Sequence, residues 1–154
     1  MSHKYFDGIV SNPNIVEDID KDLIDTVMST KEKVQKCMNE LKVADAIDCI
    51  FEIFRRSNKY IDETMPWVLA KDEEKKDRLA TVLYNLLESI RHGAVLLQAF
   101  LPDTAKEIFR QLNTNNTYYE SLNDFNGFDI DIKLNDPKPI FQRIDKDKFF
   151  SENN

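Results

Sequence analysis

Glycine is scarce in this sequence, with three copies among 154 residues. That is about 2% of the chain, against a usual share of roughly 7%. Tight hairpin turns and phosphate-binding loops both depend on glycine, because it adopts backbone conformations that other residues avoid. The scarcity therefore excludes a many-stranded β-sandwich and a P-loop enzyme.

Cysteine is also rare, and Cys37 and Cys49 are the only two copies. They form no CxxC pair, and each falls within the apolar periodicity of a predicted helix. We interpret them as inert core thiols of a protein in a reducing compartment.

Positive charge is in deficit, since 21 lysines and arginines face 28 acidic residues, for a net charge of −7. Binding along many nucleic-acid phosphates needs a basic surplus, so only recognition of a few bases by a small basic patch remains open. Long apolar runs are missing too: no stretch approaches the roughly 18 apolar residues of a membrane helix. No signal peptide is visible at the N-terminus. We expect a cytoplasmic protein that binds no membrane.

What the sequence does have is helical periodicity, with apolar residues recurring at spacings of three, four and seven. This pattern predicts helices over residues 16–41, 44–63, 73–97 and 102–112. Pro66 ends the second helix near Met65, because the residue before a proline disfavours helical geometry. Asp72 caps the third helix and Pro102 begins the fourth. Four amphipathic helices with short connections favour an all-α antiparallel helix bundle.

The chain changes character after Leu112. Residues 113–117 are turn-forming, the alternation of apolar and charged residues over 128–134 predicts a short strand, and Pro137 and Pro139 favour extended backbone. We therefore divide the chain into a helical bundle at 1–112 and an extended C-terminal segment at 113–154. This segment has no core of its own, so we expect it to pack on the bundle or on a neighbouring catalytic domain.

No catalytic motif is present, and we predict no catalytic, cofactor-binding or metal-binding residue in this chain. His3 and His92 have no cysteine or histidine at metal-ligand spacing. Asp129 and Asp131 could ligate a divalent ion, but the solvated face of a strand explains them equally well and the other oxygen ligands are lacking.

One basic neighbourhood surrounds the only tryptophan. Arg55 and Lys59 lie four residues apart, on one face of the second helix, beside Arg56. Pro66 and Trp67 follow that helix, and four more cations come after them, namely Lys71, Lys75, Lys76 and Arg78. An exposed indole here would stack on a nucleobase. The alternative is that Trp67 caps the core and the cations solvate the surface.

The run N-K-Y-I-D-E-T-M-P-W over residues 58–67 resembles the anticodon-binding domain of methionyl-tRNA synthetases, a family of class I aminoacyl-tRNA synthetases. The resemblance extends through K-Y-F-D-G at 4–8, L-A-T-V-L-Y-N-L-L at 79–87, the Leu, Phe and Pro at 97, 100 and 102, and P-I-F-Q-R-I-D at 139–145. It therefore covers nearly the whole chain.

The resemblance implies that Pro66 and Trp67 help to read the methionine anticodon, with the indole stacked on a base. Arg55, Lys59 and Lys71 are then candidate contacts to tRNA. The parent enzyme would join methionine to its tRNA using ATP, often with zinc, in a catalytic domain that would be the other partner of this chain, and it would bind no DNA. We expect the chain to be an inactive excised piece, because the family's upstream asparagine and arginine and its ATP motifs are absent. Two alternatives stay open: a helical adaptor for a protein partner, and the anticodon domain of a related class I synthetase.

Overall fold

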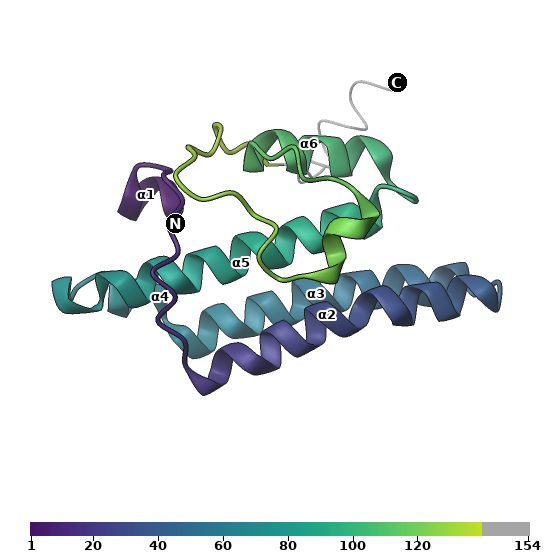
Figure 1. Cartoon of the computed structure of the whole chain (residues 1–154), viewed down its shortest axis with the longest axis horizontal. Coiled ribbons are helices and arrows are strands. Elements are labelled where there is room, and N and C mark those ends of the chain that lie inside the picture. The colour runs from purple at the N-terminus through teal and green to yellow at the C-terminus, as the bar shows by residue number, and fades with distance from the viewer. Residues whose placement is uncertain (140–154) are drawn as a thin grey trace, which may run out of the picture.

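The structure, a computed structural model, describes residues 1–139 and consists there of helices joined by short connections (Figure 1). It confirms the predicted all-α antiparallel bundle. The α-helices are α1 (Ser2–Phe6), α2 (Asp18–Asn39), α3 (Val43–Thr64), α4 (Pro66–Leu69), α5 (Lys76–Leu97) and α6 (Pro102–Leu112). Two 3₁₀ turns are η1 (Glu73–Lys75) and η2 (Tyr119–Asn123).

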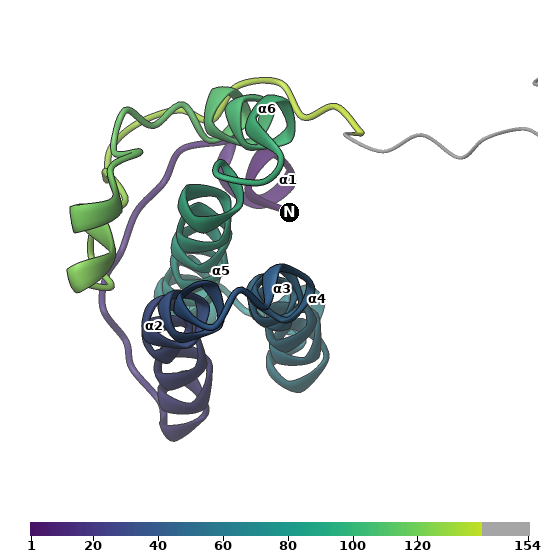
Figure 2. The ribbon, with the colours of Figure 1, turned by 90° about the vertical axis from the view of Figure 1, so that its right-hand side faces the viewer.

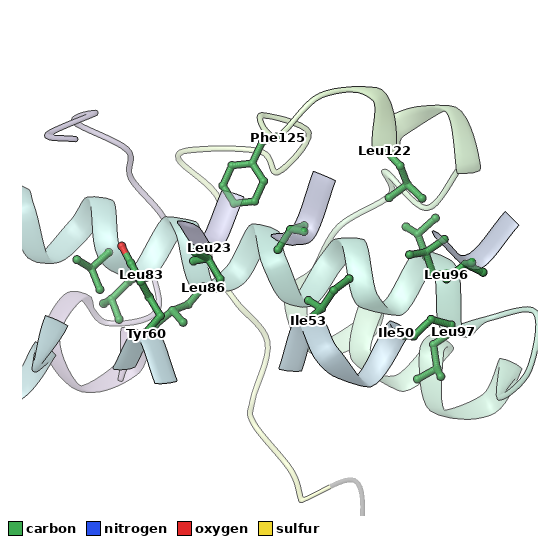
Figure 3. Close-up of a cluster of buried hydrophobic side chains, with 14 of the residues drawn as sticks. Leu23, Ile50, Ile53, Tyr60, Leu83, Leu86, Leu96, Leu97, Leu122 and Phe125 are labelled. Carbon is green, nitrogen blue, oxygen red and sulfur yellow. The ribbon is translucent and has the colours of Figure 1, made fainter. Parts of the chain in front are cut away.

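Helix α5 is the centre of the bundle. Helices α2 and α3 form an antiparallel hairpin, both pack on α5, and α6 packs on another side of α5 (Figure 2). Contacts on several sides leave α5 buried nearly all round, which explains its wide apolar face. The main core fills the space between α2, α3 and α5 (Figure 3). Its labelled members include Leu23, Ile50, Ile53, Leu86 and Leu97.

The ends of the helices follow local chemistry. The backbone N–H of Glu17 donates a 3.0 Å hydrogen bond to Asp20, which closes the first turn of α2. Asp72 accepts a 3.0 Å bond from the N–H of Glu74 and so caps η1, which leads directly into α5. The predicted cap is therefore confirmed, with a 3₁₀ turn placed between it and the helix.

Asp20 also joins three helices. Its carboxylate, fully buried, accepts two hydrogen bonds of 2.7 and 2.8 Å from Arg78 on α5 and one of 2.6 Å from the hydroxyl of Tyr60 on α3. Burial opposes ionisation of Asp20, but these hydrogen bonds outweigh it and hold the pKa of the carboxyl below its ordinary 3.8. Burial and the bond to Asp20 raise the pKa of Tyr60, so it stays a neutral donor.

The C-terminal segment up to residue 139 packs on the bundle. Leu122 and Phe125 enter the main core, while Phe128 and Leu134 join a second cluster between α5 and α6. The strand predicted at 128–134 is wrong for this part of the chain. An isolated bridge joins Ile9 to Lys133, and Asp131 adopts a left-handed backbone with φ of 60°, which breaks the extended conformation.

Most of the closing stretch at 139–145 lies outside the described residues. The division of the chain at residue 112 stays a prediction.

Candidate nucleic-acid interface

The exposed tryptophan sits on a corner between α3 and α4. Helix α3 ends at Thr64, and Met65 takes a left-handed conformation with φ of 47°, so the chain turns sharply before Pro66. Pro66 occupies the first position of α4, where its missing N–H costs nothing. The N–H of Ala70 bonds to the carbonyl of Pro66 at 2.9 Å and closes this single turn.

The two residues of the Pro-Trp pair face different surroundings. Pro66 is buried, whereas Trp67 keeps 44% of its surface exposed and Val68 keeps 43%. The apolar ring of Pro66 therefore anchors the turn from inside, and the neighbouring indole meets solvent. Leu69, at the end of the same turn, packs against the main core and fixes the turn from its other end.

The cations on α3 differ in their distance from this corner. Lys59 lies five residues before the end of α3, about 7 Å along the helix axis, and its ammonium is 3.8 Å from Glu63. Arg55 lies about 13 Å from the same end. Its guanidinium donates a hydrogen bond to Glu52 at 2.9 Å and one to Asp48 at 3.1 Å, and these two bonds raise its pKa. The positive charge of Arg55 is therefore already balanced by two carboxylates.

Several cations of the basic neighbourhood are structural. Arg56 is buried and joins Asp22 on α2 to Glu63, with distances of 2.7 and 2.9 Å. Arg78 is buried against Asp20, as described above. By contrast Lys71 is exposed, and within residues 1–139 no acidic group lies within ion-pair distance of it. Lys59 and Lys71 are thus the predicted cations best placed for a phosphate near the corner.

Helix α1 is a neighbour of this corner that sequence reasoning did not place. Tyr5 and Phe6 line one small cavity of about 80 Å³ together with Leu69 and Ala70. The N-terminal K-Y-F-D-G stretch therefore packs beside the turn that carries the tryptophan. The family resemblance was the one signal for its importance, since a helix of five residues has too few positions to show periodicity.

The candidate metal ligands have other surroundings. His92 is buried, with Nε2 at 3.0 Å from Glu88 and 3.1 Å from the carbonyl of Asp124. Asp129 and Asp131 lie on an exposed loop. Within the described part of the chain, no three histidine, cysteine or acidic side chains are grouped to hold a metal ion. No helix there is both long enough and apolar enough to span a bilayer.

Comparison with known proteins places this geometry in a family. A family model described as the anticodon binding domain of methionyl tRNA ligase matches residues 10–151. The chain belongs to this family. It is 49% identical to the methionine–tRNA ligase of Clostridium acetobutylicum and 36% identical to that of Bacillus subtilis, over 154 and 151 residues. These alignments cover 100% and 96% of this chain.

The same comparisons bound what the chain contains. It spans about a quarter of the curated relatives, covering 24% of the Clostridium ligase and 23% of the Bacillus ligase. Among solved structures, the apo form of Mycobacterium tuberculosis methionyl-tRNA synthetase superposes with a TM-score of 0.86 at 28% identity. That match covers 94% of this chain and 29% of the synthetase. The five predicted tRNA contacts, Arg55, Lys59, Pro66, Trp67 and Lys71, stay predictions.

Proposed function

We propose that this chain recognises the tRNA anticodon for a methionine–tRNA ligase, and that the anticodon loop binds at the α3–α4 corner. One observation carries the proposal: Trp67 is half exposed on a helical turn that the buried Pro66, and Leu69 packed against the main core, hold in place. An indole fixed in this way loses little freedom when a base stacks on it. Such stacking contributes about 1–3 kcal/mol per base.

The exposed lysines supply the charge that a phosphate backbone needs. Lys59 precedes the corner and Lys71 follows it, so phosphates on either side of the stacked base have a cation within reach. Arg55 sits farther along α3 and contributes only after exchanging its acidic partners for phosphate. Because the chain carries a net charge of −7, we expect weak binding. Because the phosphate contacts that remain are cationic, we expect this binding to fall steeply with salt.

The ligase as a whole would attach methionine to its tRNA with ATP in the cytoplasm, often with the help of zinc. This chain would supply tRNA binding alone, since it spans about a quarter of its curated relatives. The M. tuberculosis synthetase has been solved in complex with methionyl-adenylate, and 28% of that chain aligns with this one. The rest of the ligase would activate the amino acid, and it would be the covalently linked partner of this domain.

A helical adaptor is the second candidate function. An apolar groove of about 470 Å³ lies between the C-terminal ends of α2 and α5, lined by Val34, Met38, Val95, Phe100 and Tyr119 among others. Grooves of this kind accept the apolar face of an amphipathic helix.

Fluorescence anisotropy with labelled RNA hairpins separates the two functions. One hairpin carries the methionine anticodon and the other differs from it only in the anticodon. We expect tighter binding of the first at low salt. Equal binding of both would reduce the activity to a non-specific contact. Failure to bind either hairpin, together with binding of an amphipathic peptide, would favour the adaptor.

A further inference from the structure

The two cysteines of the chain lie on neighbouring helices. Cys37 is in the last turn of α2 and Cys49 in the second turn of α3, on either side of the connection at 40–42. That connection is tight, because the N–H of Lys42 bonds to the carbonyl of Cys37 at 2.8 Å. Both side chains are half-buried and pack against the same main core. Residues twelve positions apart in sequence are thus brought to one end of the hairpin.

Their thiols are neighbours as well. Burial raises the pKa of the Cys49 thiol, and the nearby Cys37 side chain raises it further. An effect of one thiol on another is short-ranged, so it agrees with the placement of both side chains at the same end of the α2–α3 hairpin. Both groups remain partly open to solvent, so a small reagent has access to them. The sequence pattern predicted two separate, inert core thiols. In the structure the α2–α3 hairpin brings the two cysteines to the same end of the bundle.

We propose that Cys37 and Cys49 form a reversible dithiol site, which a hydroperoxide converts into a disulfide linking α2 to α3. The proposal is independent of tRNA binding. The pair lies toward the α2–α3 tip of the hairpin, at the end of the bundle remote from α4 (Figure 1). Oxidation therefore leaves the α3–α4 corner unchanged.

The chemistry takes two balanced steps. The Cys37 thiolate attacks one peroxide oxygen, the O–O bond breaks, and the leaving alkoxide or hydroxide takes a proton, so that Cys37 becomes a sulfenic acid. The Cys49 thiolate then attacks the Cys37 sulfur, the S–S bond forms, the S–O bond breaks, and the leaving hydroxide takes a proton to become water. Two thiols lose two electrons and the hydroperoxide gains them. Cys49 takes the second step, because its raised pKa leaves less thiolate for the first.

Peptide mapping tests the pairing directly. The chain is treated with hydrogen peroxide at low protein concentration, alkylated without reductant, denatured and digested with trypsin. Cleavage after Lys36, Lys42 and Arg55 places the two cysteines in separate peptides, 37–42 and 43–55. We expect the two peptides to be joined in the monomer and released by dithiothreitol. Two alkylated peptides, or disulfides only between chains, would overturn the proposal.

Single variants distinguish the roles of the thiols. Cys49→Ala should accumulate a sulfenic acid on Cys37 that dimedone traps, whereas Cys37→Ala should react several-fold more slowly with peroxide. The disulfide closes a short loop and restricts the unfolded chain, so the oxidised protein should melt several degrees higher than the reduced one. A doubly substituted Cys37→Ala, Cys49→Ala chain controls for oxidation of the four methionines. An equal rise in that control would show that the disulfide does not stabilise the hairpin.

Discussion

Arg91 and Glu88 form an ion pair inside the protein, joined by hydrogen bonds of 2.7 and 2.8 Å, and neither side chain reaches solvent. The pair also connects α5 to the C-terminal segment. Arg91 donates to the carbonyl of Asn116 at 2.9 Å and to the hydroxyl of Ser121 at 2.7 Å. Glu88 accepts a 3.0 Å bond from the N–H of Gly127. Two side chains of one helix therefore hold a segment some 30 residues away in sequence.

Arg91→Met should destabilise the domain strongly. The variant leaves Glu88 buried without its cation, and breaking one side of a buried pair costs about 3–5 kcal/mol. We expect a lower denaturation midpoint and earlier proteolysis within residues 114–127. Arg110→Met is the matched control, because Arg110 pairs with Glu107 at the same spacing on the exposed surface of α6. Equal effects of the two variants would contradict the assigned role of burial.

The stability of the domain should fall as the solution becomes acidic. Burial opposes ionisation of Asp20 and Glu88, but hydrogen bonds from Arg78 and Tyr60 to the first, and from Arg91 and His92 to the second, hold both pKa values below the ordinary 3.8 and 4.5. The unfolded chain therefore binds more protons in this range, and stability increases with pH. The stability that these two carboxylates contribute should be complete above about pH 5 and should decline as the pH falls through 4 toward their pKa values in the folded protein.

Urea denaturation between pH 7 and pH 3 measures this dependence. Asp20→Asn removes one of these two buried titrating groups and should flatten the acid limb of the profile. Asp18→Asn serves as the control, since Asp18 is exposed and pairs with Lys21 at 3.4 Å. A profile unchanged by Asp20→Asn would show that the buried carboxylate does not drive acid unfolding.

Tyr60→Phe should cost about 1.5–3 kcal/mol of stability, the range for a hydrogen bond to a charged group. The hydroxyl of Tyr60 donates to Asp20 at 2.6 Å and accepts a 3.2 Å bond from Asn85, so its loss affects two buried groups. Tyr84→Phe should cost less, because Tyr84 donates at 3.2 Å to the neutral carbonyl of Phe128. Thermal unfolding of both variants, compared at one pH, checks the order.

Helix positions could be predicted from this sequence because apolar periodicity is a local property. The expected ends at Met65 and Pro102 agree with α3 and α6, since proline acts on its own neighbours. Local periodicity failed at 128–134, within the described residues, where it predicted a strand that the structure does not contain. The alternation there reflects packing of Phe128 and Leu134 on α5 and α6, while Asp131 turns the backbone between them.

The sequence motif was enough to predict which residues belong to the candidate site. It was not enough to predict which of their charges form ion pairs inside the protein. Pro66 and Trp67 stand out as a rare dipeptide after a helix. The cations beside them look alike in sequence, yet Arg78 is buried against Asp20, 58 residues away. Tyr60 belongs to the same motif and serves the core, not the surface. No local pattern distinguishes such a residue from one that contacts RNA.

Lys59→Ala should weaken binding of both RNA hairpins by a similar factor. Lys59 is exposed and loosely paired with Glu63, so its contribution to a phosphate contact is independent of base identity. The dependence of affinity on salt should become shallower by about one unit of slope in a log–log plot. Lys21→Ala, which removes an exposed lysine of α2 already paired with Asp18, is the control. A loss confined to the methionine anticodon would assign Lys59 to base recognition instead.

Trp67→Ala should leave the domain folded and remove its preference for the methionine anticodon. With 44% of its surface exposed, the indole contributes less to the core than a buried tryptophan, whose truncation costs about 3–5 kcal/mol. Loss of stacking should instead cost about 1–3 kcal/mol of binding to the matching hairpin, or roughly 5- to 150-fold in affinity. Trp67→Phe keeps an aromatic face and should restore part of this affinity. Thermal melts and anisotropy titrations of the two variants decide the role of the side chain. Unfolding by Trp67→Ala, with anticodon preference retained in the fraction that still folds, would make the tryptophan a cap of the core.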